Sequence, residues 1–478
     1  MNNILYEYNY TKCIEPIYGN KRNEIEDTLL YKESINKSNM LSNDNLERDI
    51  INDEVYTIDP EGCKDADDAF SIYEEDNKLY LAIHIADPTH YIPLNSLLWN
   101  DITNRGTTKY LSNRTPIHMI PDEILKLSSL MTFDKDENKY TISVITEINK
   151  NTYEPINNIQ LKFCKVFIKK ENSFTYKEAS TYINKSNTMQ LNISNALKIG
   201  LQISNSLFNL RKKKTKGIIL SELSNAYIKY EDNNVCLYED SHEEKLMKHM
   251  IAEFAIFANS FVGEYLKIHL NTGIFRTCVA KEWLDTIQST ISSEEMLQEI
   301  ITNGIKADYI SNIQSHDLVG MPEYCHFTSP IRRLSDCVCH YLLKFIYLKN
   351  KNIEHMIPFN KVELDNLSNI CLKENKKDKK NQYLDIKFRL LQVMANMIYK
   401  NGNINIEYYI TGYSGLFLNI MICKIDTYNV HMSYTLRIRN YNKDINPKEK
   451  FSLNVTHVNC FTKFDENTIP ELDKHILE

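Results

Sequence analysis

The sequence lacks the features that would direct it to a membrane or to secretion. No apolar run approaches the ~18 residues that a membrane-spanning helix needs. The N-terminus, MNNILYEYNYTKC, has no basic region followed by an apolar core, so it does not match a secretory signal. We therefore expect a cytoplasmic protein without a membrane partner.

Closely paired cysteines are also missing. The 11 cysteines are scattered and include no CxxC motif, whereas a structural zinc site would want two closely spaced pairs of ligands. Even Cys337 and Cys339, which stand two residues apart, have only Cys325 upstream of them. We expect free and mostly buried thiols.

Positive charge is not in excess either, since the formal net charge is −7. This balance argues against a protein that coats nucleic acid over its whole surface, but it is compatible with a local basic channel. Two basic runs, residues 211–216 and 373–380, are candidates for such a channel. The alternative for each run is a solvated loop or helix face.

What the sequence does contain is the composition of an ordinary globular protein, with 42% hydrophobic and 25% charged residues. The 478 residues suffice for a large main domain and one or two smaller ones. Changes in texture predict an α+β protein with four regions: an N-terminal extension, irregular or a small appended element, at 1–47, a main domain at 48–350, a helical connector at 351–400 and a small antiparallel β-barrel at 401–478.

Hydrophobic periodicity predicts the core elements of the main domain. Residues 79–87, LYLAIHIAD, are apolar on both faces of a strand, which is typical of a core strand, and residues 139–157 indicate another strand or a hairpin. Residues 249–266 place an apolar stripe on one side of a helix. A second helix is predicted over 329–348, with Ser329 as the cap and Pro330 in the first turn.

One short stretch, TIDPEGCKDADDAF at residues 57–70, concentrates negative charge among strand-like neighbours. It contains Asp59, Asp65, Asp67 and Asp68. Two carboxylates ~4 Å apart repel each other by about 4 kcal/mol at an effective dielectric constant of 20. The cluster therefore needs protons, water or cations to be tolerated.

Three interpretations of this cluster can be compared. An EF-hand calcium loop would need Gly and Glu where Lys64 and Phe70 stand, so that interpretation fails. A plain acidic surface loop would not need the neighbouring Ile58 and Phe70, which favour burial. Carboxylate oxygens are the ligands that Mg²⁺ prefers, and two such ions ~3.5–4 Å apart make a phosphodiester-cleaving site.

The same stretch resembles the catalytic signature of the ribonuclease II/ribonuclease R superfamily, an Asp-Pro pair followed by D-x-D-D. Four further segments are similar to motifs of that family, in its order: HIADPTHYI at 84–92, RGTTKYLSNRTPIHMIPDEILKLSSL at 105–130, IAEFAIFAN at 251–259 and HFTSPIRRLSDCVCH at 326–340. The resemblance implies an RNB-type catalytic domain at 48–350, a mixed β-sheet surrounded by helices, and a small OB-like β-barrel at 401–478.

Several positions depart from the family pattern, and none of them lies in the acidic cluster. Ala252 and Ala255 stand where the family has Glu and Met in a helix motif, and the other departures are Ser128, Cys278 and Leu334. These changes bear on substrate grip and rate more than on the chemistry. The extension at 1–47 is also too short for the two cold-shock barrels of bacterial relatives, so most of that RNA-binding platform is expected to be absent.

The resemblance implies a Mg²⁺-dependent 3′→5′ exoribonuclease that hydrolyses single-stranded RNA to nucleoside 5′-monophosphates in RNA degradation or processing. By similarity, Asp59 and Asp68 would be direct ligands of Mg²⁺, and Asp65 and Asp67 would complete the site directly or through water. Asp65, Asp67 and Arg332 would be the catalytic residues. The alternative is a catalytically silent RNB-fold scaffold that only binds RNA, against which the presence of all four aspartates argues.

Two arginines are candidates for contact with RNA. Arg332 sits just inside the predicted second helix, where a guanidinium can fork onto a phosphate beside the helix N-terminus. We expect Arg332 to be the phosphate contact and Arg333 a secondary one. The alternative for Arg332 is an i,i+4 ion pair with Asp336, and Ser329 and Thr328 fit capping as well as substrate contact.

Two tyrosines are candidates for stacking on RNA bases. Tyr110 falls where the family places an aromatic near the RNA 3′ end, and Tyr227 is a candidate for a clamp farther out. Base–aromatic stacking contributes ~1–3 kcal/mol and tolerates any sequence, as an unspecific exonuclease requires. The alternative for each is a core tyrosine. Other conspicuous residues are expected to be structural: His84, Asp87, His90, His326 and His340.

The expected partner is single-stranded RNA, distinguished from DNA through its 2′-hydroxyl groups. The expected state is a monomer, with membership of a larger degradation complex left open. A third hypothesis is a single-strand DNA-binding or repair protein built on the terminal barrel. It has less support because that barrel shows no clear aromatic platform.

Overall fold

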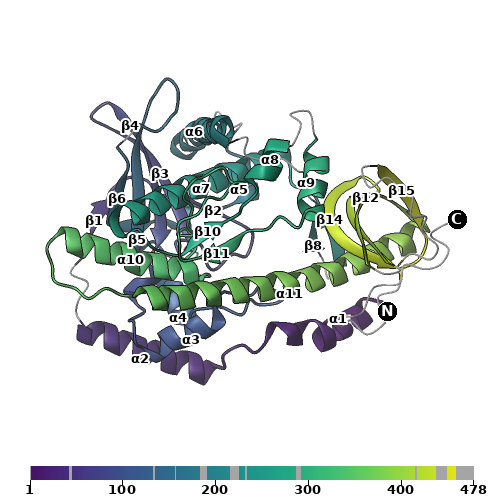
Figure 1. Cartoon of the computed structure of the whole chain (residues 1–478), viewed down its shortest axis with the longest axis horizontal. Coiled ribbons are helices and arrows are strands. Elements are labelled where there is room, and N and C mark those ends of the chain that lie inside the picture. The colour runs from purple at the N-terminus through teal and green to yellow at the C-terminus, as the bar shows by residue number, and fades with distance from the viewer. Residues whose placement is uncertain are drawn as a thin grey trace.

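The computed structural model describes residues 2–41, 46–132, 135–156, 158–183, 191–215, 226–231, 234–286, 292–414, 417–437 and 449–458. Figure 1 shows a large body of helices and strands, and one long helix, α11 (Lys361–Asn401), that runs from this body to a separate β-sheet. The mixture of helices and mainly antiparallel strands confirms the predicted α+β class.

The body is built on a five-stranded sheet with the order β1-β6-β5-β4-β3. Its strands are β1 (Asp49–Ile51), β3 (Asp68–Glu75), β4 (Lys78–Ala86), β5 (Glu137–Ile148) and β6 (Gln160–Ile168). Neighbours pair antiparallel except β1, which lies parallel to β6. In the interior strand β4, Leu81, Ile83 and Ile85 are buried, which confirms the predicted core strand.

Helices pack on this sheet. α6 (Leu191–Thr215) and α7 (His242–Leu270) lie against each other and contact β3 and β4 (Figure 1). α7 buries Met250, Phe254 and Ala258 of the predicted apolar stripe. The other elements between β1 and α11 are β2 (Thr57–Asp59), η2 (Pro88–His90), α3 (Leu97–Arg105), α4 (Asp122–Ser128), η3 (Lys170–Asn172), β7 (Ser173–Thr175), α5 (Tyr176–Ser180), β8 (Tyr227–Glu231), β9 (Asn234–Tyr238), β10 (Phe275–Thr277), α8 (Lys281–Thr286), α9 (Ser293–Thr302), β11 (Asp308–Ile310) and α10 (Leu334–Asn350).

The predicted second helix begins later than the sequence suggests. The sequence predicts a start at Ser329, but α10 begins at Leu334, with Arg333 as an extended N-cap residue. The cause is a long-range hydrogen bond, because the backbone N–H of Ile331 donates to the Asp67 carboxylate at 2.8 Å and holds residues 330–332 in a turn. Arg332 therefore lies before the helix, and the prediction that it sits inside the first helical turn is wrong.

The N-terminal region is more regular than an irregular extension. It contains α1 (Asn2–Cys13), η1 (Glu15–Tyr18) and α2 (Glu24–Leu41), which lie along one edge of the molecule (Figure 1). α1 and η1 bury a stripe of large side chains against α11, and its members are Tyr6, Tyr10, Ile14 and Tyr18. The expectation of an irregular segment is wrong here, and a small appended element is the accurate description.

The C-terminal sheet has four antiparallel strands in the order β14-β13-β12-β15. They are β12 (Ile404–Ser414), β13 (Phe417–Ile425), β14 (Tyr428–Arg437) and β15 (Lys450–Val455). In the described part of this region no pairing joins β14 to β15, so a closed OB-like barrel is not confirmed. Residues 438–448 and 459–478 of the predicted barrel lie outside the described residues.

Two expectations drawn from missing features can be checked in the described residues. All ten cysteines among them are free and seven of these are buried, as expected for free and mostly buried thiols. None of the described helices is long and apolar enough to cross a membrane.

Candidate active site

A cavity of about 830 Å³ lies beside the acidic stretch. Its wall comes from residues 59–68, residues 110–118, one face of α7 and residues 324–333. It gathers all the predicted catalytic and metal-binding residues and one of the two predicted stacking tyrosines: Asp59, Asp65, Asp67, Asp68, Tyr110, Arg332 and Arg333. Segments more than 250 residues apart in the chain therefore meet at one place.

Backbone hydrogen bonds hold the acidic loop in this wall. Asp59 ends β2 and Asp68 begins β3, so the loop between them is anchored at both ends by strands. Within it, the Ala66 N–H donates to Ser129 Oγ at 3.2 Å, and the Ala66 carbonyl accepts from the Leu130 N–H at 2.9 Å. Ser129, which sequence reasoning did not assign to the site, thus fixes the loop that carries the aspartates.

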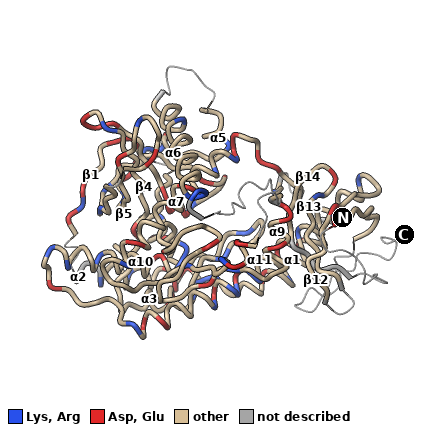
Figure 2. The backbone as a smooth tube through the Cα atoms, turned by 45° about the horizontal axis from the view of Figure 1, so that its top comes forward, with Lys and Arg blue, Asp and Glu red and all other residues tan. Residues whose placement is uncertain are grey.

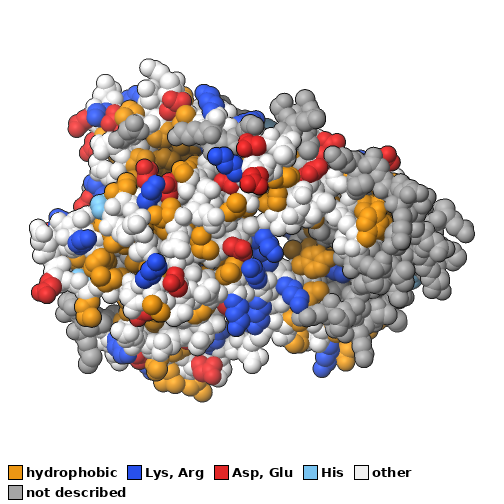
Figure 3. Space-filling model, in the orientation of Figure 1, with side chains coloured by type: hydrophobic (Ala, Val, Ile, Leu, Met, Phe, Trp, Pro, Cys, Tyr) orange, Lys and Arg blue, Asp and Glu red, His pale blue; other side chains and the backbone are white. Residues whose placement is uncertain are grey.

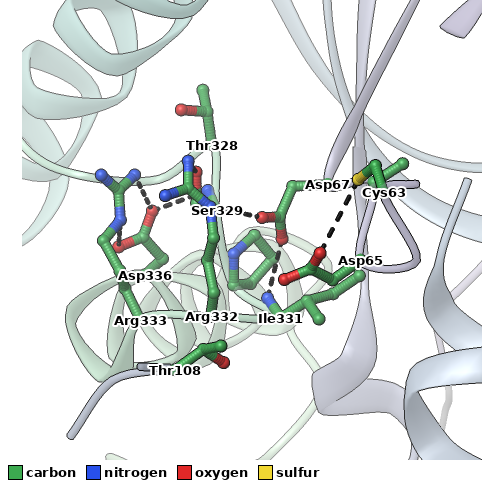
Figure 4. A network of polar contacts seen from close by, with 12 residues as sticks. Cys63, Asp65, Asp67, Thr108, Thr328, Ser329, Ile331, Arg332, Arg333 and Asp336 are labelled. Carbon is green, nitrogen blue, oxygen red and sulfur yellow. Dashed lines mark hydrogen bonds and ion pairs between the residues drawn. The ribbon is translucent and has the colours of Figure 1, made fainter. Parts of the chain in front are cut away.

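Asp67 faces the turn before α10 (Figure 4). Its Oδ1 accepts from the Ile331 N–H at 2.8 Å, and its Oδ2 accepts from Arg332 Nε at 3.1 Å. Burial raises the pKa of Asp67 well above its ordinary value, and the Arg332 guanidinium lowers it only in part. Asp67 therefore links the acidic loop to the arginine that the sequence predicts to contact phosphate.

Asp59 and Asp68 carry less counter-charge than they need. Burial, and after it the repulsion from Asp68, raise the pKa of Asp59 to about 8. Burial raises the pKa of Asp68 to about 6 although Arg332 opposes the shift. Within the described residues, Asp59 Oδ2 is buried and has no hydrogen-bond partner. A bound cation would lower both raised pKa values and give the buried Oδ2 of Asp59 a partner.

The donor set fits a hard divalent cation, although the cluster is not closed around an ion site. Carboxylates in excess of their counter-charges, one with an unpartnered buried oxygen, are the ligands that Mg²⁺ prefers. No group of three His, Cys, Asp or Glu side chains in the described part of the chain is gathered tightly enough to hold a metal as it stands. The fit therefore rests on the chemistry of the donors rather than on a formed coordination sphere.

Cys63 lies between two of the aspartates, a feature that sequence reasoning missed. Its Sγ is 3.7 Å from Asp59 Oδ1 and 3.7 Å from Asp65 Oδ1. Burial, followed by the nearby charge of Asp59, raises the pKa of this thiol. Cys63 is thus a neutral neighbour in the acidic loop rather than a thiolate.

Tyr110 stands at the rim of the cluster. Its ring lines the cavity with 37% of the residue exposed, and its hydroxyl donates to Asp65 Oδ2. Burial and the charge of Asp65 raise the pKa of the phenol, so it remains a donor. The ring is therefore available to a ligand while the hydroxyl is tied to the acidic loop, and the alternative of a plain core tyrosine does not apply.

The two arginines have different partners from those expected. Arg332 does not pair with Asp336. Its Nε donates a hydrogen bond to Asp67, and its Nη2 donates to Ser329 Oγ at 2.8 Å. Arg333 takes Asp336 instead, with Nε and Nη2 donating at 2.9 and 2.7 Å (Figure 4). The Arg332 side chain is 42% exposed, against 21% for Arg333. Arg332 is therefore the guanidinium that a ligand can reach.

Tyr227, the second predicted stacking residue, is not part of the cavity wall. It lies at the start of β8 with 37% of the residue exposed. The ammonium group of Lys248, which does line the cavity, is 4.9 Å from the centre of its ring. Tyr227 therefore stands one side chain outside the cavity.

Neither basic run lines the cavity in the described residues. Arg211 is buried and pairs with Glu253 at 2.5 Å, so the start of the first run is structural. The side chains of residues 214–216 lie outside the described part. The second run lies on α11, where Lys373, Lys376 and Lys377 are exposed and outside the cavity wall. Figure 3 shows basic side chains gathered where α11 crosses the molecule.

The departures in α7 give the cavity a partly apolar wall. Ala252 and Ala255 line it, whereas Glu253 points away toward Arg211. Farther along α7, Asn259 accepts hydrogen bonds at Oδ1 from the N–H groups of Phe327 and Thr328, at 2.7 and 3.2 Å. Asn259 therefore positions the segment that leads to Arg332, a role that its sequence motif did not reveal.

Two of the residues predicted to be structural are confirmed by their partners. The buried His84 lies between the hydroxyls of Ser71 and Ser143, and burial lowers its pKa to about 3. Although burial alone would raise it, Lys344 and other nearby cations hold the pKa of Asp87 well below its usual range. Neither lines the cavity.

The remaining predicted structural histidines differ in position. His340 is buried and lies 3.1 Å from the Phe327 carbonyl, and His90 packs against neighbouring aromatic rings. His326 lines the cavity but is bonded to the Tyr309 hydroxyl at 2.6 Å, and burial lowers its pKa well below the usual value. His326 is therefore a neutral part of the wall.

Buried carboxylates short of counter-charge, beside an exposed guanidinium, are the features of a site for a cation and a phosphate ester. The fold and the cavity thus define an α+β protein with a candidate phosphodiester site. The family description "RNB domain" matches residues 47–349, more than half of the chain, so the chain belongs to the RNB domain family. This confirms the predicted resemblance to the ribonuclease II/ribonuclease R superfamily.

Known proteins of this kind give the context. The human exosome complex exonuclease RRP44 is 27% identical over 333 residues, which cover 60% of this chain and 33% of the relative. The chain spans about a third of the length of the first curated relatives it matches. The apo form of Mycoplasma genitalium RNase R aligns with a TM-score of 0.71 at 18% identity, over 95% of this chain and 76% of that one.

Two further solved structures share the fold. Mycoplasma genitalium RNase R is also known in complex with ribose-methylated single-stranded RNA, with a TM-score of 0.70 at 17% identity over 95% of this chain and 76% of the other. Yeast Ssd1, a pseudonuclease, aligns with a TM-score of 0.57 at 15% identity, over 84% of this chain and 55% of that one. At these identities the likeness is one of fold alone.

Proposed function

We propose that this chain is a 3′→5′ exoribonuclease that hydrolyses single-stranded RNA to nucleoside 5′-monophosphates in RNA degradation or processing. The observation that carries the proposal is the single cavity in which Asp59, Asp65, Asp67 and Asp68 meet Arg332. Membership of the RNB domain family supports the same conclusion, because the relatives that match include a named exonuclease.

The residues of the cavity divide the work of such a reaction. Asp59, Asp65, Asp67 and Asp68 would hold Mg²⁺, which when bound activates water and offsets the charge that develops at phosphorus. Arg332 binds the phosphate through the part of its guanidinium that Asp67 and Ser329 leave exposed.

Tyr110 supplies the grip on the RNA. Its ring stacks on a base near the 3′ end, while the bond from its hydroxyl to Asp65 keeps the ring beside the acidic loop. The alanines of α7 leave room for the nucleotide next to this ring. Arg333, held by Asp336, is a secondary contact for the strand, and Tyr227 is proposed as a clamp farther from the cavity.

A labelled-RNA assay tests this proposal. A 5′-labelled single-stranded RNA is incubated with the chain and Mg²⁺, and a matched sample contains EDTA. In the first sample we expect the labelled RNA to shorten from its 3′ end with release of nucleoside 5′-monophosphates. In the second sample we expect it to stay intact. Products with 3′-phosphates, or degradation unaffected by EDTA, would contradict the proposal.

A catalytically silent scaffold that only binds RNA is the second candidate. Two observations favour it: both oxygens of Asp67 are engaged by Ile331 and Arg332, and the pseudonuclease Ssd1 shares the fold. The same assay separates the two, since a scaffold would bind the labelled RNA in a gel shift and leave it intact with either Mg²⁺ or Mn²⁺.

The finer features of the molecule's setting are proposals as well. We take the sheet β12–β15 to be the core of an OB-like barrel, because its strands are antiparallel and strongly curved in Figure 1. We also propose that the chain works in the cytoplasm as a monomer, or within a larger degradation complex as the name of the relative RRP44 indicates for that protein.

A further inference from the structure

A single irregular loop supplies much of the cavity wall. Residues 110–119, here named the Tyr110 loop, contain no helix or strand and pair only through an isolated bridge. The loop contributes five lining residues: Tyr110, Arg114, Thr115, Pro116 and His118. A segment of this kind keeps one conformation only where contacts from other elements outweigh its conformational entropy. Those contacts come largely from residues 2–22, here named the N-terminal arm.

A buried carboxylate on α11 joins the arm to the loop. Asp385, which is 1% exposed, accepts three hydrogen bonds at one oxygen, Oδ2. Tyr10 and Tyr18 of the arm donate their hydroxyls at 2.8 and 3.1 Å, and the N–H of Ser112 in the loop donates at 3.0 Å. The arm therefore fixes the carboxylate that in turn fixes the loop.

Two arginines extend this connection. Arg389, whose side chain is fully buried, donates to Glu7 of the arm at 2.6 Å and to the Ser112 carbonyl at 3.4 Å. Arg114 of the loop pairs with Glu7 at 3.0 Å and also with Glu15. Charges on the arm thus match charges on both the loop and α11.

The arm also holds the far end of the loop. Arg22 donates to the His118 carbonyl at 3.2 Å and to the Met119 carbonyl, and it is anchored by Asp101 at 2.6 Å. At the near end, Tyr110 reaches the acidic cluster through Asp65. The arm therefore holds the middle and the far end of the loop, while the hydroxyl of Tyr110 at the near end donates to the acidic loop.

We propose that the N-terminal arm supports the RNA site by holding the Tyr110 loop in the conformation that binds RNA. Tyr10, Tyr18 and Arg389 are the positioning residues of this support. This inference rests on the proposed function, because it takes Tyr110 to stack on RNA. None of the three lines the cavity; they act through Asp385 and Ser112. Figures 1 and 2 show α1 running beside the distal half of α11, where this network forms.

A pair of conservative substitutions tests the proposal. Tyr10→Phe with Tyr18→Phe removes two donors from Asp385 and keeps both rings in the core. Tyr8→Phe is the matched control, because Tyr8 lies on the same helix with 59% of its surface exposed. All variants are made in the full chain and first compared by thermal unfolding.

Two readouts follow the loop and its ligand. Hydrogen–deuterium exchange of a peptide spanning residues 108–120 is expected to speed up in the double variant and to stay unchanged in Tyr8→Phe. The Kd for fluorescently labelled single-stranded RNA, measured in EDTA by anisotropy, is expected to rise about tenfold, which equals the ~1.4 kcal/mol of a lost buried hydrogen-bond contribution. The control should match the wild type.

A double-mutant cycle separates positioning from general damage. Tyr110→Ala is expected to raise the same Kd, and combining it with the double variant should add little, because both changes remove the same contact. Unchanged exchange and Kd in a folded double variant, or fully additive effects, would overturn the proposal. If the double variant unfolds early, the single variants Tyr10→Phe and Tyr18→Phe, each retaining one hydroxyl donor, are measured in the same way.

These measurements fail separately from the exonuclease proposal, because binding in EDTA needs no hydrolysis. A wild-type chain that binds RNA but does not cleave it contradicts the exonuclease alone, and the exchange and Kd values still decide the role of the arm. A wild-type chain that binds no single-stranded RNA overturns both.

Discussion

Two polar clusters contact the start of the Tyr110 loop. One is the acidic loop, which Tyr110 reaches through Asp65, and the other is the network around Asp385, which accepts from the Ser112 N–H. They differ in how far nearby cations offset the charge of their carboxylates. In the acidic loop, burial and the neighbouring Asp68 raise the pKa of Asp59 to about 8. In the network around Asp385, burial would raise the pKa of Glu7, but Arg389 and Arg114 bring it below its ordinary value. In the acidic loop Arg332 is ion-paired with Asp67, whereas in the second cluster the half-buried Glu7 is paired with two arginines, Arg389 and Arg114.

This difference in charge compensation distinguishes a candidate binding site from a structural contact between elements. Unmatched buried charge costs stability unless a ligand compensates it, so the acidic loop is a candidate site for a cation. Matched charge stabilises one geometry of the chain itself. We therefore expect substitutions in the first cluster to abolish function, and substitutions in the second to act on stability and on the position of the loop.

The largest effect is expected for Asp67→Asn, which removes a carboxylate charge and keeps an oxygen for the Ile331 N–H. Hydrolysis of labelled RNA with Mg²⁺ should fall below detection, because the cluster loses part of its cation affinity and its link to Arg332. RNA binding in EDTA, measured by anisotropy, should stay within about twofold. Mononucleotide release at the wild-type rate would show that the metal assignment is wrong.

The next effect concerns the exposed guanidinium of the same cluster. Arg332→Ala should lower kcat by about 10²–10³, equivalent to about 2.7–4 kcal/mol, because an electrostatic contact to the reacting phosphate is lost. Arg332→Lys is the matched control and should fall between the two, since it keeps the charge without the planar fork. A change of less than about twofold for Arg332→Ala would reduce Arg332 to an ion-pair partner of Asp67.

The second cluster should respond in stability instead. Glu7→Gln removes the carboxylate charge that faces the fully buried Arg389, so the free energy of unfolding in urea should drop by about 1.5–3 kcal/mol. Glu123→Gln, in an exposed pair with Lys126, is the control and should change it by less than about 1 kcal/mol. Equal effects of the two substitutions would remove the distinction between the clusters.

The smallest effect is a pH dependence of the metal-free chain. The pKa of Asp59 is about 8 in the folded chain, against an ordinary value of about 4 when unfolded. Between these values the folded chain keeps a proton that the unfolded chain has released, so the free energy of unfolding in EDTA should fall as the pH rises, by at most about 1.4 kcal/mol per pH unit for this group.

Denaturation in urea at a series of pH values checks this slope. Asp59→Asn should reduce it, and Mg²⁺ should restore stability at the alkaline end because a cation replaces the proton. A profile that is flat in EDTA would mean that the acidic loop carries no uncompensated charge.

The acidic cluster could be predicted because its residues are close together in the sequence. The partners of these residues could not be predicted. The four aspartates fall within ten residues, so their proximity follows from the chain itself. The exchange of partners between Arg332 and Arg333 depends on Asp67, which lies 265 residues away from Arg332. That same contact moves the start of α10 from Ser329 to Leu334, so local capping rules failed where a long-range bond took over the backbone.

The N-terminal arm was missed for a different reason. Its buried stripe consists of Tyr6, Tyr10 and Tyr18 with Ile14, at intervals of four residues. That spacing is helical, but tyrosine reads as a surface residue when the partners of its hydroxyl are unknown. Those partners lie on α11, more than 360 residues farther along the chain. The prediction for Arg211 failed in the opposite direction. Its place in a basic run suggested an exposed side chain, but it is buried in an ion pair with Glu253.

The long helix α11 has a mechanical consequence. Its 41 residues make a rod about 60 Å long at 1.5 Å per residue. In its first half it packs on Gly106, where any Cβ would come within 2.8 Å of Glu374 Cβ, and its far end packs against the C-terminal sheet. α11 therefore contacts both the C-terminal sheet and the segment that precedes the Tyr110 loop, so an anchor or a fusion that displaces the sheet would also act on the helix that packs against Gly106.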